Sequence, residues 1–555
     1  MSKQTEQEKE RVRSLFGENR ELDSNPDKEH SVKCLNGTFV PKVQDAIRVF
    51  RGIPFAMPPI GERRWKKPLP IPDGDKVFEA YYNGRSPIQT VIDSERASYY
   101  PQSEDCLYLN VCVNDECKDN NKPIMVFIHG GAYGWGGTVD PLYDGLNFIK
   151  LHPEVILITI AYRVGLFGFV DLSYLKGGEE YPDAPNLGIY DQIEALRWIQ
   201  KNGKAFGGDI NNVTIFGESA GGGSVSLLPL IKEAKGLFHR VIAESGSLAL
   251  TYGREECKYF TDKLIKAAKT DSMADLIKLS TEELAKLNEG LNESNNFPMR
   301  DGNLIPIDPY EPYKQGLTKD IDMILGTNAN EMNYWIGELG GLFAYSAGMP
   351  IKYNDDIAKV SKEDQKFIKQ FIKIAKGNRV ARITEFYNEI MFRLPAIAQA
   401  EYHSENKGNV YKYYWKEESK IPLYKACHAV ELAYVFYNIE DTIYTGEKAD
   451  EELARNVSNM WVNFAKTGDP SLESIKWQKY NKKERKTITF KKDNIKEEYN
   501  ILSQQRELLW PIVKYMINPG YADLLDRLTL ADKTSSAIGA VFSCISTLLK
   551  EGIID

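Results

Sequence analysis

The sequence predicts an α/β protein with a large, mostly parallel central sheet and helices on both faces of that sheet. The main observation is a series of short apolar runs rich in β-branched residues, at residues 123–128, 155–160, 213–216, 241–243 and 321–325. These runs are almost continuously apolar and do not alternate, which indicates strands that are covered on both faces. Longer segments of helical or loop character separate them, as parallel strands require.

Four segments have the pattern of helices. Residues 191–201 carry apolar side chains at helical spacing and are predicted to form a crossover helix between two strands. Residues 451–467 form another predicted helix, which the glycine at position 468 should end. Residues 273–291 and 361–376 are amphipathic and lie far from any strand pattern. We expect them to be helical insertions that cap the active-site edge of the sheet.

Composition and length favour one large enzyme domain. The chain has 555 residues, with 42% hydrophobic and 27% charged residues, and shows no internal repeat or low-complexity linker. We therefore expect a polar N-terminal extension over residues 1–30, a catalytic domain over 31–530 and a C-terminal amphipathic helix over 531–555. The net charge of −8 argues against nucleic acid as a partner. The oligomeric state is left open.

The ends of the chain and its cysteines bear on its location. Residues 1–30 lack the apolar core of a secretory signal, and no apolar run reaches the length of a membrane span. Seven cysteines, an odd and scattered set, favour free, buried thiols in a reducing compartment. The expected location is the cytoplasm. The apolar stripe of the C-terminal helix could pack on the protein's own body, on a second subunit or on a membrane.

The clearest chemical motif is Gly-x-Ser-x-Gly, which runs from Gly217 to Gly221 directly after an apolar strand. A sharp strand-to-helix turn of this kind exposes a serine hydroxyl above the sheet, and glycines on both sides leave room for the turn. Ser219 is therefore the candidate nucleophile. The pentapeptide alone is a weak signal, so the remaining catalytic groups must be found elsewhere.

A base and an acid should follow the serine in the order serine, acid, histidine. Of the six histidines, His403 and His428 lie well downstream. His428 follows the predicted strand at 409–415 and is the preferred base, whereas His403 lies within a predicted helix. The loop after the strand at 321–325 contains one carboxylate, Glu331, which is the candidate acid. An ordinary exposed glutamate is the alternative at that position.

A glycine-rich loop over residues 129–137 directly follows the strand that ends at residue 128. Backbone N–H groups in such a loop can stabilise the negative charge that develops on a carbonyl oxygen. Gly131 and Ala132 are candidate donors, and Ala220, next to the nucleophile, is the third. The alternative is a flexible surface loop. No metal ion or organic cofactor is expected, since this chemistry needs neither.

Matching blocks along nearly the whole chain resemble the type-B carboxylesterase/lipase family, which includes the cholinesterases. The sequence is most similar to the bacterial para-nitrobenzyl-esterase-like members of that family. The blocks lie at residues 50–56 with 58–59, 103–111, 129–132, 186–188 with 191–192, 206–209, 217–222 and 464–470. The resemblance implies the α/β-hydrolase fold and a triad of Ser219, Glu331 and His428.

The resemblance also implies a gorge lined by aromatic side chains, with Tyr133, Trp135, Tyr334 and Trp335 as candidates, and with Glu218 beside the nucleophile. The expected activity is hydrolysis of small carboxylic esters through an acyl-enzyme. A lipase acting at lipid interfaces and a non-catalytic binding protein of the same fold are the alternatives. Two of the chain's departures from the family bear on its disulfides and its substrate. A loop bridge to Cys106 is doubtful, because no cysteine lies between Cys34 and Cys106, and residues 93–102 lack the tryptophan that holds choline.

Overall fold

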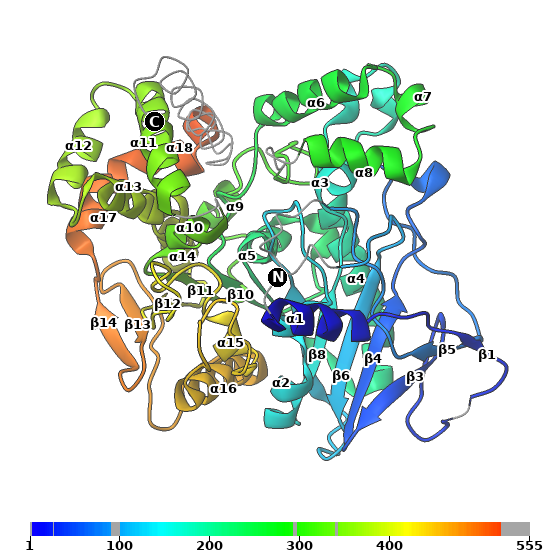
Figure 1. The fold of residues 1–555 in the computed structure, drawn as a ribbon. Helices are drawn as coiled ribbons and strands as arrows, with labels where there is room; N and C mark the ends of the chain where they lie inside the picture. Colours follow the sequence, from blue (N-terminus) through cyan, green and yellow to red (C-terminus); the bar gives the residue numbers. More distant parts are fainter. Residues whose placement is uncertain (1–2, 26, 90–99, 292–296, 339–341, 523–555) are drawn as a thin grey trace.

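The computed structural model describes residues 3–25, 27–89, 100–291, 297–338 and 342–522 (Figure 1). Its described strands join into one 14-stranded sheet. The C-terminal helix predicted over residues 531–555 lies outside the described residues. Among the described helices, none combines the length and the apolar character that crossing a membrane requires.

Seven neighbouring strands form the parallel centre of the sheet, and this arrangement confirms the predicted fold class. In spatial order they are β8 (Ile156–Ile160), β7 (Lys122–Ile128), β9 (Gly208–Glu218), β10 (Arg240–Glu244), β11 (Asp322–Asn328), β12 (Val410–Trp415) and β13 (Lys486–Phe490). Five of them coincide with the apolar runs of the sequence. Because parallel strands place their carboxyl ends at one edge, the loops after β7, β9, β11 and β12 gather there.

Strands that pair mostly antiparallel flank this centre. On one side the order continues through β6 (Tyr108–Asn114), β4 (Ile47–Pro54), β3 (Gly37–Gln44), β5 (Val77–Ala80) and β1 (Glu21–Leu22), with β2 (Val32–Cys34) paired to β3. On the other side β14 (Lys496–Tyr499) pairs antiparallel with β13. The pair of β3 and β5 is the one parallel pair among these described flanking strands, so the sheet is mixed at its edges.

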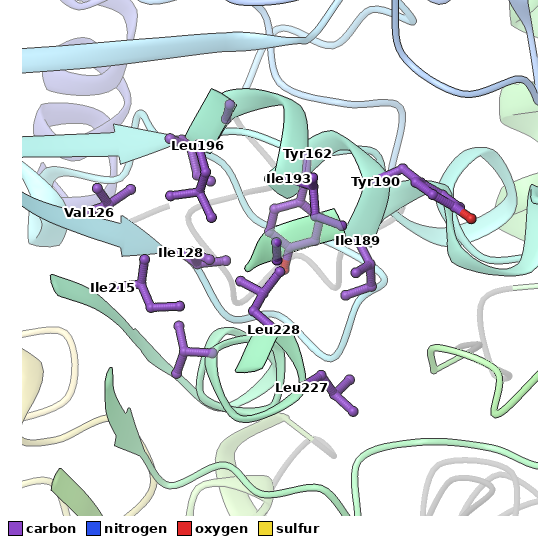
Figure 2. Close-up of a cluster of buried hydrophobic side chains, with 14 of the residues drawn as sticks. Val126, Ile128, Tyr162, Ile189, Tyr190, Ile193, Leu196, Ile215, Leu227 and Leu228 are labelled. Atoms are coloured by element: carbon purple, nitrogen blue, oxygen red, sulfur yellow. The ribbon is translucent and has the colours of Figure 1, made fainter. Parts of the chain in front are cut away.

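Both faces of the central strands are buried, which explains their continuous apolar character. In β7, Ile124 and Val126 face the core that contains α4 (Leu187–Asn202) and α5 (Ala220–Leu227), as Figure 2 shows in part. The alternate residues Met125 and Phe127 face the opposite core, formed with α15 (Leu432–Val435) and α16 (Glu451–Thr467). Successive side chains of a strand point to opposite faces, so each strand contributes to two cores.

The helices predicted at 191–201 and 451–467 are confirmed as α4 and α16. Asp450 accepts a hydrogen bond from the N–H of Leu453 at the start of α16, and Gly468 ends the helix with φ = 79°. Glycine adopts that left-handed conformation without steric cost, as expected for a helix C-terminus.

Two groups of helices lie above the strands in Figure 1. The first group comprises α6 (Arg254–Ala268), α7 (Met273–Leu276) and α8 (Thr281–Gly290). The second group comprises α11 (Leu342–Lys359), α12 (Gln365–Ile374) and α13 (Arg379–Tyr387). The helices of the second group share a third apolar core with α14 (Leu394–Glu405) and α17 (Ser503–Leu509). The single helix expected over 273–291 is divided in two. Ser280 and Glu283 form a capping box that starts a new helix there.

The polar N-terminal extension contains a helix, α1 (Lys3–Ser14). Its Val12 is fully buried in a small apolar cluster with Tyr100 and Val139, against which Trp135 packs. The extension is therefore packed on the glycine-rich loop of the catalytic domain.

Candidate active site

Ser219 occupies a strained turn between β9 and α5. Its backbone dihedrals are φ = 57° and ψ = −119°, which a residue with a side chain rarely adopts. The turn is held against the end of β7: a Cβ at Gly221 would lie 1.9 Å from the carbonyl oxygen of Ile128, and one at Gly217 would lie 2.6 Å from the same atom. Glycine is therefore required at both positions flanking the serine.

Glu331 lies in a short 3₁₀-helix, η10 (Glu331–Asn333), after β11, and its side chain is fully buried. Its Oε1 accepts hydrogen bonds from the backbone N–H of Asn328 (2.6 Å) and from Oγ of Ser245 (2.8 Å). Its Oε2 lies 2.7 Å from Nδ1 of His428. Both carboxylate oxygens thus have fixed partners, and the exposed-glutamate alternative is wrong.

His428 follows β12 and is 5% exposed. Its contact with Glu331 leaves Nε2 as the ring nitrogen available for proton transfer. The rings of Trp335, Tyr334 and Phe392 surround the imidazole, with centroid separations of 5.4, 6.0 and 5.2 Å. His403 instead lies within α14, where its Nε2 is 3.0 Å from the backbone oxygen of Ile321.

Glu218, the residue directly before Ser219, is buried beside the base. Its Oε1 lies 3.1 Å from Nε2 of His428, although the two atoms are not aligned for a hydrogen bond. Burial and the nearby carboxylates of Glu431 and Glu331 raise the pKa of Glu218 to about 8. Burial opposes protonation of His428, but the charges of Glu218 and Glu331 outweigh it and raise the pKa of the imidazole to about 9.

Two further buried glutamates, Glu431 and Glu244, lie near the triad, and the sequence analysis predicted neither of them. Glu431 accepts hydrogen bonds from Nδ2 of Asn328 (2.5 Å) and, at 3.4 Å, from Oγ of Ser245. Glu244 accepts one from the indole of Trp461 at 2.8 Å. Burial raises the pKa of both carboxyl groups, to about 7 for Glu431. The position of Glu431, three residues after His428 in the same loop, was the signal that could have identified it.

The glycine-rich loop passes directly over the nucleophile. A Cβ at Gly130 would lie 3.1 Å from Cβ of Ser219 and 2.9 Å from the backbone oxygen of Glu218. Gly131 and Ala132 have φ values of 98° and 49°, and neither N–H is paired with another described residue. Ala220 begins α5, so its N–H has no partner within that helix. Three amide groups are thus available near the serine.

The structure places only some of the candidate pocket residues next to the base. Trp335 contacts the base and Glu218 lies beside it, whereas Trp135 packs against the cluster below α1. Tyr133 is a correction: its side chain is fully buried in the core, with Oη 3.3 Å from Oγ of Ser224 and its ring against Phe169. The side chain of Tyr133 therefore packs against α5 inside the core and does not line an open pocket.

No group of three or more histidine, cysteine, aspartate or glutamate side chains in the described part of the chain is arranged to hold a metal ion. The six described cysteines are free, and five of them, including Cys34 and Cys106, are buried.

Comparison with known proteins identifies the class. The model of the carboxylesterase family matches residues 32–508, and the chain therefore belongs to that family. Among characterised relatives, para-nitrobenzyl esterase of Bacillus subtilis (strain 168) is 32% identical over 495 residues, which cover 84% of this chain and 96% of that protein. Human bile salt-activated lipase is 32% identical over 77% of this chain and 60% of the lipase.

Solved structures agree. A Geobacillus stearothermophilus carboxylesterase at pH 6.2 matches with a TM-score of 0.77 and 30% identity, over 86% of this chain and all of that one. A thermophilic para-nitrobenzyl esterase matches with a TM-score of 0.76, again at 30% identity, over 87% of this chain and all of that one. The chain is a serine carboxylesterase with the α/β-hydrolase fold, as the sequence predicted.

Proposed function

We propose that the chain hydrolyses small carboxylic esters with Ser219 as nucleophile, His428 as general base and Glu331 as the group that orients the base. The observation that carries this proposal is the 2.7 Å contact between Nδ1 of His428 and the buried Glu331, next to the strained turn of Ser219. With Nδ1–H donated to Glu331, the lone pair of Nε2 is free to accept the serine proton.

The reaction then follows in two steps. As Nε2 of His428 accepts its proton, Ser219 attacks the ester carbonyl, and the imidazolium returns that proton to the departing alcohol. The N–H groups of Gly131, Ala132 and Ala220 stabilise the oxyanion, each contributing on the order of 3 kcal/mol. Water activated by His428 then releases the acid from Ser219.

The substitution Ser219→Ala tests the nucleophile. The variant should fold normally, lose on the order of 10⁴-fold or more in turnover of p-nitrophenyl acetate, and no longer react with a fluorophosphonate probe. Ser404→Ala, on α14, is the matched control and should keep both properties. Substantial turnover in the Ser219 variant would contradict the assignment.

The acyl preference is tested by a series of p-nitrophenyl esters of increasing chain length. An esterase acting on dissolved substrate should follow simple saturation with the short esters. A sharp rise in rate above the concentration at which the long esters form micelles would instead favour the interfacial lipase.

We also propose a cytoplasmic location. The free, buried thiols of Cys34, Cys106, Cys112, Cys257 and Cys427 support a reducing environment. Cell fractionation with activity staining should find the enzyme with cytosolic markers, and recovery with secreted protein would overturn this proposal.

A further inference from the structure

A small cavity lies next to the C-terminal strands of the sheet, apart from the proposed triad. It is bounded by β11, β12, the π-helical turn η11 (Asn388–Arg393) and the segment that leads into α17. No residue of the proposed triad lines it. Its polar lining consists of Thr327, Arg393, Lys412, Tyr413, Tyr414, Tyr480, Arg485, Thr487 and Arg506. Four of these side chains, Arg393, Lys412, Arg485 and Arg506, are basic, and none is acidic.

Lys412 lies in the middle of β12, a central strand, and is only 3% exposed. Its Nζ has no hydrogen-bond partner among the residues that the structure describes. An ammonium group buried without an anion is costly, because burial removes its hydration. Burial and the neighbouring charge of Arg393 accordingly lower the pKa of Lys412 to about 7.

Other donors around the same cavity are also unsatisfied. Nη1 of Arg393, Oγ1 of Thr327 and Oη of Tyr480 lack partners within the described residues, and all three residues are at least 95% buried. Donors that share one cavity and lack acceptors point to a missing acceptor. A single small group with several acceptor oxygens would satisfy them together.

The carboxylates nearby already have partners. Glu389 binds Arg393 through both of its oxygens, and Glu401 accepts a 2.9 Å hydrogen bond from Nε of Arg485. Neither of them contacts Lys412. Among the described residues, therefore, no carboxylate supplies the counter-charge for Lys412.

The π-helical turn explains how Arg393 reaches this position. Pro395 follows it at the start of α14 and has no N–H to donate to the preceding turn. The helix widens there, and π-helical turns of this kind often accompany binding sites. Arg393 is locked by Glu389 while its Nη1 stays free.

We propose that this cavity binds a small inorganic oxyanion of the phosphate class. Guanidinium groups and an ammonium are the side chains that best match the oxygens of such an ion. The cavity leaves about 20 Å³ for the centres of water-sized atoms, which suits a small ion and excludes an organic ligand of ordinary size. Arg485 is 22% exposed and gives the ion a route from solvent.

Isothermal titration of the full-length chain with sodium phosphate, at constant ionic strength set by sodium chloride, tests the proposal. We expect one phosphate per chain with saturable binding, sulfate as an effective competitor, and chloride as a weaker one because it cannot accept bidentate hydrogen bonds. Lys412→Met should weaken phosphate binding at least tenfold, and Tyr480→Phe several-fold. Lys416→Met, which removes a half-buried lysine just beyond β12 that is paired with Glu498, should leave the binding unchanged.

Thermal unfolding is a second measurement, and it distinguishes a lysine that binds phosphate from one that only stabilises the fold. In phosphate-free buffer, Lys412→Met should melt at the same temperature as the wild type or higher, because it removes an unpaired buried cation. Saturating phosphate should raise the melting temperature of the wild type but not that of the variant. No saturable binding to the wild type, or binding that survives in Lys412→Met, would overturn the proposal and leave a cavity that holds water only.

Discussion

At the scale of single residues, the environment of His428 sets the pH at which the enzyme works. The imidazole must be neutral to accept the proton of Ser219, so a pKa raised to about 9 moves the onset of activity to higher pH. Glu218, 3.1 Å from Nε2, is the first of the charges that raise this pKa.

Glu218→Gln should therefore lower the pKa of His428 and shift the acid limb of the kcat/KM profile to lower pH, by on the order of one unit. The measurement is the rate of p-nitrophenyl acetate hydrolysis between pH 5 and 10. Glu363→Gln, which changes an exposed glutamate in the turn between α11 and α12, should not move the limb. A profile unchanged in Glu218→Gln would mean that another charge controls the base.

Glu331 and His428 could be proposed from the sequence because each is the one suitable side chain in a loop after a predicted strand. Glu431 and Glu244 were missed, since both act through buried contacts with residues far apart in the chain, and Glu244 lies at the end of a strand and not in such a loop. Tyr133 was misassigned because adjacency to a motif does not tell which way a side chain points. Its positive φ of 57° turns it into the core.

At the scale of elements, the junction of β9 and α5 tolerates no enlargement. Gly221→Ala would place a Cβ 1.9 Å from the carbonyl oxygen of Ile128, a backbone atom that cannot move without disturbing β7. The substitution should lower the free energy of unfolding by about 3 kcal/mol or more. Chemical denaturation followed by tryptophan fluorescence measures this change.

Gly74→Ala is the matched control, because the nearest atom to a Cβ there lies 3.7 Å away. Its stability should stay close to that of the wild type. Equal stability of the two variants would show that the turn relaxes more easily than its packing indicates.

The strands of the parallel centre were predictable because burial on both faces makes them continuously apolar. The antiparallel strands at the edges were not predicted, since edge strands such as β14 carry charged side chains in place of an apolar run. The break between α7 and α8 within residues 273–291 could have been predicted from the sequence. Ser280 and Glu283 have capping-box spacing, but the apolar periodicity continued past them.

At the scale of the whole molecule, the N-terminal extension is part of the packed structure. Val12 of α1 is fully buried against Tyr100 and Val139, next to the loop that carries Trp135. Val12→Asp would place an unpaired carboxylate in this cluster, so the extension should detach at a cost of about 1 to 3 kcal/mol. Hydrogen exchange of residues 3–14 should become faster, while Glu10→Gln, on the exposed face of α1, leaves it unchanged. Unaltered exchange in Val12→Asp would contradict the packing.

The buried cysteines have a practical consequence for work with this enzyme. Burial raises the pKa of Cys34 and of Cys112 to about 12, and oxidants and alkylating reagents attack the thiolate form. Five of the six described sulfhydryls are therefore shielded while the chain is folded. These thiols should therefore stay reduced during storage without a reductant. The rate at which they react with a chromogenic disulfide reagent would measure the rate of global unfolding.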